Sequence, residues 1–196
     1  SRGFLDKALW LEEKRSTLLY YGLVYVVGLM YQLYYYYFMA MYVFANFDLE
    51  KFLILLTPYI LLLFLFPVAL VFLKMPFLPY VKYGFAGTIL LSSLVAELVS
   101  YSKMGYYDGG NIGEVFMVIF AAIFVNQTFF WFVSGVLIAK YLIVSLIYPE
   151  LFYKILLPLA LSAVVCLLGY VILRRFLAYV RSINTVYNEH FSSMVK

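Results

Sequence analysis

Residues 114–150 read EVFMVIFAAIFVNQTFFWFVSGVLIAKYLIVSLIYPE, and this stretch decides the class of fold. Its charged side chains are Glu114, Lys140 and Glu150, and almost all the rest is apolar. About 20 apolar residues are enough to span a bilayer as an α-helix. The polar tripeptide Asn126–Thr128 leaves two alternatives, one long helix or two helices joined tightly there. In either case the stretch predicts an integral membrane protein.

The composition of the whole chain agrees with this class. Of the 196 residues, 66% are hydrophobic and 12% are charged, and the mean hydropathy is +0.97. Soluble domains carry about 25% charged residues. The sequence therefore predicts an all-α integral membrane protein with the lipid bilayer as its first partner.

Several chemical functions are excluded by what the sequence lacks. One histidine and one cysteine, Cys166, cannot supply a bis-histidine haem pair or a Cys/His zinc cluster from a single chain. There is no P-loop and no paired-carboxylate motif with a partner base. Basic and aromatic residues are not interleaved as in nucleic-acid-binding proteins. We therefore expect no catalytic residue, no metal site, no cofactor and no nucleic-acid partner in these residues.

Six transmembrane helices are predicted, with five as the alternative. Four are expected over residues 17–45, 51–73, 80–102 and from 154 past 173, and residues 114–150 supply two more if the stretch divides. Basic residues collect in cytoplasmic loops. Six spans with a cytoplasmic N-terminus place most of them on that side, namely Arg2, Lys7, Lys14, Arg15, Lys74, Lys82, Arg174, Arg175, Arg181 and Lys196. Five spans divide these charges more evenly, so we prefer six spans with both termini in the cytoplasm.

The sequence divides into three parts. Residues 1–15 alternate apolar and charged side chains around Trp10, which is typical of an amphipathic helix on the membrane surface. Residues 16–175 form the transmembrane bundle, in which the fourth helix, about 114–125, is short and is expected to tilt or to enter the membrane part-way. Residues 176–196 are expected to form a cytoplasmic signalling helix, and we predict that it leads to an output domain beyond Lys196.

The signalling helix carries an apolar seam with the spacing of a coiled coil. Its residues, 4-3-4-3-4 apart, are Phe176, Val180, Ile183, Tyr187, His190 and Met194. Such a/d spacing favours pairing of two parallel helices. We therefore predict a homodimer that forms through this exit helix.

Tyrosines crowd the first predicted helix, and they have two interpretations. Most of them, Tyr20 and Tyr21 at one end and Tyr34–Tyr37 at the other, are expected in the aromatic belts at the membrane surfaces. Gln32 and Tyr35 belong to a polar face that includes a glycine, which is typical of a seam between membrane helices. A ligand-lining role for this face is the alternative.

Glu97 is an acidic residue clearly inside a predicted span. Intramembrane carboxylates are rare and mark functional sites by default, although an interfacial contact with Tyr101 or Lys103 is the alternative. Lys140 must either extend to the interface or find a partner. The candidate ligand-binding residues, at the outer mouth of the bundle, are Gln32, Tyr34, Tyr35, Glu97, Tyr106, Tyr107 and Asp108.

Three segments carry a resemblance of layout to a known group of proteins. They are VKYGFAGTILLSSLVAELV at 81–99, YYDGGNIGEVFMVIFAAIFV at 106–125 and LLGYVILRRFLAYVRSINTVY at 167–187. The chain resembles the six-helix N-terminal membrane domains of bacterial signalling enzymes, namely adenylyl cyclases, sensor histidine kinases, diguanylate cyclases and HD-type phosphodiesterases. The resemblance implies a multi-pass protein of the bacterial plasma membrane, a dimer, and a cytoplasmic enzyme domain. It transfers no functional residue.

Three functions remain open at this point. The first is a sensor and anchor module that dimerises and relays a helix rearrangement to an enzyme domain. The second is a small transporter, or its substrate-binding subunit, with Gln32, Glu97 and Lys140 along the path. The third is a structural subunit of a larger membrane complex. The exit helix favours the first, because neither alternative needs a cytoplasmic a/d seam.

Overall fold

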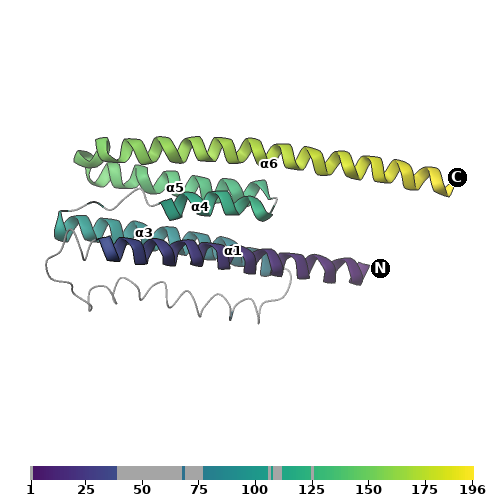
Figure 1. Ribbon diagram of the computed structural model, residues 1–196, viewed down its shortest axis with the longest axis horizontal. Coiled ribbons are helices and arrows are strands. Elements are labelled where there is room, and N and C mark those ends of the chain that lie inside the picture. Colours follow the sequence, from purple (N-terminus) through teal and green to yellow (C-terminus); the bar gives the residue numbers. More distant parts are fainter. Residues whose placement is uncertain (1, 39–67, 69–76, 106, 108–111, 125) are drawn as a thin grey trace.

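The computed structural model describes residues 2–38, 68, 77–105, 107, 112–124 and 126–196. These residues form a bundle of long helices in which both chain termini lie at the same end (Figure 1). The helices are α1 (Arg2–Phe38), α3 (Val81–Met104), α4 (Ile112–Ala121), α5 (Gln127–Ile147) and α6 (Phe152–Val195), with short 3-10 turns η2 (Leu78–Tyr80), η3 (Ala122–Phe124) and η4 (Pro149–Leu151). The prediction of an all-α fold is confirmed.

Three helical segments of the described residues are long and apolar enough to cross a membrane. They are Leu78–Val99, Gln127–Ile147 and Pro149–Val195. The chain is therefore a membrane protein with several crossing helices. The predicted span 51–73, and the part of the first predicted span beyond Phe38, lie outside the described residues.

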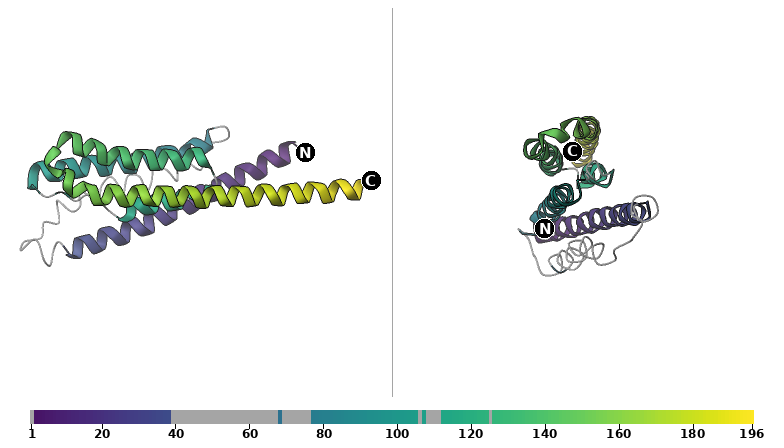
Figure 2. Two further views of the ribbon diagram at one scale, coloured as in Figure 1. Left: turned by 90° about the horizontal axis from the view of Figure 1, so that it is seen from above. Right: turned by 90° about the vertical axis from the view of Figure 1, so that its left-hand side faces the viewer.

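The helices pack in layers. Viewed along the bundle, α3 and α4 lie between α1 and the pair formed by α5 and α6, and α1 is inclined to the others (Figure 2). The contact of α6 with α5 is close at Gly169, where an added Cβ would lie 2.8 Å from Cζ of the fully buried Phe130. A glycine at this position lets the two helices approach one another.

The N-terminal segment, for which we predicted an amphipathic helix on the membrane surface over residues 1–15, is helical in the structure. It is continuous with the first predicted span, and α1 runs from Arg2 to Phe38 without a break. Neither glycine nor proline occurs between residues 4 and 21. The Thr17 hydroxyl donates a hydrogen bond to the Glu13 carbonyl at 2.7 Å, so this polar side chain is satisfied within the helix.

The stretch 114–150 divides into two helices, which is the alternative that six spans require. Asn126 is the N-cap of α5, and its side-chain oxygen accepts hydrogen bonds from the backbone N–H groups of Thr128 at 2.9 Å and Phe129 at 3.3 Å. These bonds satisfy donors that a helix start leaves unpaired. α4 is short, as expected, and its 10 residues begin part-way along the bundle (Figure 1).

Aromatic side chains fill the core toward the end that carries the termini. Tyr20 is fully buried, and its ring meets Phe85 and Phe129 edge-on at 5.9 and 5.5 Å between centroids. Its hydroxyl donates a hydrogen bond to the carbonyl of Met117 in α4 at 3.2 Å. The belt position that we expected for Tyr20 is therefore wrong, because the inclined α1 turns this residue toward α3, α4 and α5.

Lys82 joins α1 to α3 at the same end of the bundle. Its ammonium forms an ion pair with Glu13 of α1 and lies 5.0 Å from the ring centroid of Phe124. The Lys82 side chain is 3% exposed, whereas that of Glu13 is 22% exposed. A lysine that we counted among the cytoplasmic loop charges is thus part of the packing between two helices.

Candidate functional site

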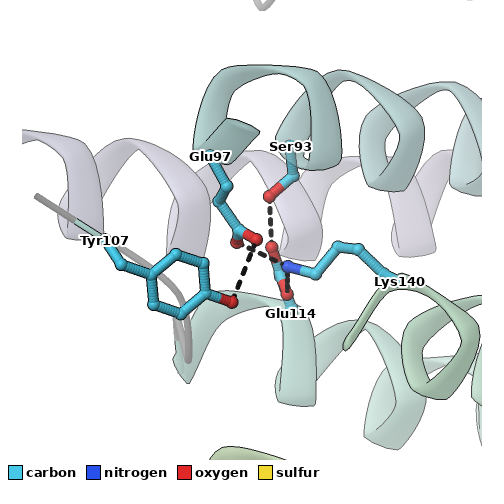
Figure 3. A network of polar contacts seen from close by, with 5 residues as sticks. All are labelled: Ser93, Glu97, Tyr107, Glu114 and Lys140. Atoms are coloured by element: carbon cyan, nitrogen blue, oxygen red, sulfur yellow. Dashed lines mark hydrogen bonds and ion pairs between the residues drawn. The ribbon is translucent and has the colours of Figure 1, made fainter. Parts of the chain in front are cut away.

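Three helices bring three charged side chains together inside the bundle (Figure 3). Nζ of Lys140 in α5 lies 2.6 Å from Oε1 of Glu97 in α3, and it also forms an ion pair with Oε2 of Glu114 in α4. The Lys140 side chain is 2% exposed, and each glutamate side chain is 5% exposed. We call Glu97, Glu114 and Lys140 the charged triad.

The position of each charge follows from its helix. Glu114 lies in the first turn of α4, where the helix dipole favours a negative charge. Lys140 lies within α5, whose other residues carry no charge, so its ammonium needs a partner inside the bundle. The alternative of extension to the interface is therefore wrong for Lys140, which binds two carboxylates instead.

Two hydroxyl groups also donate hydrogen bonds to the carboxylates. Ser93, one turn before Glu97 on α3, donates a hydrogen bond to Oε1 of Glu114. Tyr107, in the connection between α3 and α4, donates to Oε2 of Glu97 at 3.4 Å (Figure 3). Burial, and then the negative charge of Glu97, raise the pKa of Tyr107. Its phenol therefore keeps its proton and remains a donor.

Tyr141 extends this polar region from the triad to α6. The residue is fully buried, and its hydroxyl lies close to Glu114 and to Ser162 of α6. The Tyr141 and Ser162 hydroxyls lie near one another, and that of Tyr141 also lies near Glu114, but the orientations fall outside ideal hydrogen-bond geometry among the residues that the structure describes. Both are buried polar groups beside a charged cluster.

The triad has an unequal charge count, because two carboxylates face one ammonium. An ion pair that is buried and multiply hydrogen-bonded can be stable, whereas a buried uncompensated charge is costly. Among the described residues no cluster of histidine, cysteine, aspartate and glutamate could hold a metal ion.

The predicted site residues have different positions in the structure. Glu97 and Tyr107 meet in the site, and their predicted role in ligand binding stays a prediction. Tyr34 lies on α1, and 67% of its side chain is exposed. Gln32 and Tyr35 belong to α1, but their side chains lie outside the described residues, as do Tyr106 and Asp108 altogether.

Sequence reasoning grouped Glu114 with Glu97 at an acidic outer mouth, but it did not join Ser93 to Glu97 or Glu114 to Lys140. It placed Glu97 and Lys140 together only in the transporter alternative. Opposite charges at Glu114 and Lys140 within one otherwise apolar stretch were the signal that could have predicted the ion pair between these two residues. The interfacial alternative for Glu97 named Tyr101 or Lys103. The Tyr101 hydroxyl donates to Glu150 at 3.1 Å, and the side chain of Lys103 lies outside the described residues.

The fold and site define an α-helical membrane domain with a buried charged cluster, and a comparison with protein families identifies its kind. The model of the MASE12 family matches residues 11–174. The chain therefore belongs to the MASE12 family, a family of membrane-associated sensor domains. No curated protein and no solved structure matches the chain.

Proposed function

We propose that this sensor domain anchors a signalling enzyme in the membrane and relays a helix rearrangement to it. The observation that carries the proposal is the path of α6. This helix passes the triad at Ser162, next to Tyr141, and continues as one helix to Val195. A change in the packing around the triad would therefore reach the far end of the same rigid element.

The proposed topology has six crossings and both termini in the cytoplasm. Two features support it: the termini lie at one end of the bundle (Figure 1), and the basic residues of the sequence favour that end as the cytoplasmic one. The six crossings include the predicted span 51–73. α4 and η3 together are too short to span about 30 Å of hydrocarbon, so this crossing also needs the connection that precedes α4.

The proposed assembly is a dimer through the exit part of α6. Along the seam, Phe176 is 48%, Ile183 is 50% and Tyr187 is 67% exposed in the single chain. An exposed apolar stripe with a/d spacing, on a helix that extends beyond the bundle, is typical of a coiled-coil partner surface. A second copy would bury this stripe and set the two enzyme domains side by side.

Cysteine cross-linking tests the dimer. In a Cys166→Ala background, Ile183→Cys on the seam is expected to form a disulfide-linked dimer in membranes on mild oxidation. Thr185→Cys, on the opposite face of the same turn, is the matched control and is expected to stay monomeric. The readout is the dimer fraction on a non-reducing gel. Equal cross-linking at the two positions would contradict a parallel seam at these residues.

A chimera tests the relay. α6 is joined, in heptad register, to a cyclase catalytic domain that is active as a dimer, and the chimera is assayed in membrane vesicles. Glu97→Gln, which changes the charge of the triad, is expected to change cyclase activity severalfold. Glu150→Gln, an exposed carboxylate outside the triad, is the control and is expected to have no effect. Activity that is unchanged by Glu97→Gln, Glu114→Gln and Lys140→Met alike would reject the relay.

A further inference from the structure

One face of α6 is already occupied inside the bundle. Continued toward the N-terminal end of the helix with the same spacing, the seam that begins at Phe176 reaches Leu173, Cys166 and Ser162. These three residues are at most 3% exposed, because α6 packs against α4 and α5 there (Figure 2). Cys166, for example, lies next to Ser134 of α5. A coiled coil with strict heptad spacing therefore cannot continue from the exit part of α6 into the membrane, since α5 covers the face that it needs.

The exposed apolar residues of α6 follow a different repeat. A first line of side chains, each at least 50% exposed, recurs every eleven residues at Leu161, Ile172, Ile183 and Met194. A second line lies four positions later, at Val165, Phe176 and Tyr187. An eleven-residue repeat corresponds to 3.67 residues per turn, which is close to the 3.6 of a straight α-helix, so the two lines follow one face. We call these seven residues the long stripe.

The long stripe carries no charge, and it keeps its apolar character beyond the membrane. The charged residues of α6 that follow Leu161 lie on other faces of the helix, namely Arg174, Arg175, Arg181, Glu189 and Lys196. In the proposed topology, Arg174 and Arg175 lie at the cytoplasmic membrane boundary, where basic residues collect. Lipid can cover the part of the stripe before them, but not Ile183 and Met194 after them. An apolar surface of this kind in water indicates a protein partner.

The exit part of α6 is short for a dimer contact on its own. From Phe176 to Met194 the seam covers fewer than three heptads, whereas a coiled coil usually extends over about three to four. The long stripe adds the membrane part of α6 to the contact without displacing α5. A second copy of this chain supplies the matching surface, because a contact with two-fold symmetry uses the same face on both chains.

We propose that α6 pairs with α6 of a second copy along the long stripe, inside the membrane as well as beyond it. This inference rests on the dimer of the proposed function, and it adds the membrane half of the interface. The partner helix lies beside α5, on a neighbouring face of α6. A movement of α5 against α6 therefore reaches the dimer interface within the bilayer, and not only at the end of the exit helix.

Cysteine cross-linking within the membrane tests the proposal. In a Cys166→Ala background, Ile172→Cys and Leu161→Cys are expected to form disulfide-linked dimers when membranes are treated with a membrane-permeant oxidant. Val171→Cys and Ala160→Cys, at neighbouring exposed positions on another face, are the matched controls and are expected to give a severalfold lower dimer fraction. Ile172 is 66% and Val171 is 61% exposed, so this pair differs in direction and not in accessibility.

The native cysteine has the opposite expectation. Cys166 is buried on the face that packs against α5, so the unchanged chain is expected to form no disulfide-linked dimer under the same oxidation. Cross-linking through Cys166 would overturn the proposal, and so would dimer fractions at Ile172 and Leu161 that are no higher than those of the controls. A dimer fraction at Ile172 that falls to the control level at a higher ratio of lipid to protein would indicate random collision and would also overturn it.

The Ile183→Cys variant separates this proposal from the function on which it rests, because Ile183 reports the exit part of α6 alone. If Ile183→Cys cross-links while Ile172→Cys and Leu161→Cys do not, the dimer stands and the membrane half of the interface is wrong. If none of the three cross-links, the proposed dimer is wrong, and the pairing along the long stripe is wrong with it.

Discussion

Lys140→Met is expected to destabilise the folded chain by about 3–5 kcal/mol, the cost of leaving buried charges without their partner. Lys140 is the counter-ion of both Glu97 and Glu114, and all three side chains are almost fully buried. Methionine keeps the length and apolar stem of lysine, so the loss measures the charge and not a cavity. The measurement is the midpoint of unfolding by SDS in mixed micelles.

Two comparisons make this prediction specific. Lys154→Met, at an exposed position near the start of α6, is the matched control and is expected to change stability by less than about 0.5 kcal/mol. The triple variant Lys140→Met, Glu97→Gln, Glu114→Gln is expected to recover most of the stability, because none of its three side chains carries a charge. A Lys140→Met chain as stable as the wild type, without the glutamine changes, would show that the triad contributes nothing to folding.

Lys82→Met is expected to have the second largest effect, a loss of about 2–3 kcal/mol. The substitution removes the partner of Glu13 and the cation that packs against the ring of Phe124. The loss is smaller than at Lys140, because Glu13 keeps access to water and can remain ionised without its partner. The same unfolding assay measures it.

The control for this second prediction is Lys7→Met on the exposed face of α1, where no effect beyond about 0.5 kcal/mol is expected. Limited proteolysis adds a second readout, since weaker attachment of α1 should expose its N-terminal part to chymotrypsin, whose aromatic sites neither lysine substitution removes, before the rest of the bundle unfolds. If Lys82→Met is as stable and as protease-resistant as Lys7→Met, α1 is held by its aromatic contacts alone.

The class of fold could be predicted because it depends on local patterns. Apolar runs of sufficient length predict membrane helices, and the division at Asn126 was one of the two alternatives because the polar tripeptide Asn126–Thr128 interrupts the apolar stretch. The course of α1 was harder to predict from the sequence. Its charged and apolar parts differ in composition, but no residue between them ends a helix, so the backbone continues where the change in polarity suggested a boundary.

The candidate site could be predicted only in part, because it is made of contacts between distant residues. Glu97 was found since a carboxylate inside a span is unusual by itself. Its link to Lys140, 43 positions along the chain, depends on the packing of α3 against α5, which no local pattern reveals. Tyr20 shows the same limit. Its place near the start of the predicted span 17–45 does not reveal whether its side chain faces lipid or three neighbouring helices.

The uninterrupted course of α6 has a mechanical consequence. From Ser162 to Val195 the helix has no proline, and its one glycine, Gly169, is packed against Phe130. These 33 residue steps make a lever about 50 Å long. A tilt of about 5° at Ser162 would therefore displace the far end by about 4 Å, given the rise of 1.5 Å per residue. A shift too small to disturb the packing of the bundle is in this way enlarged to the width of a side chain at the distal tip.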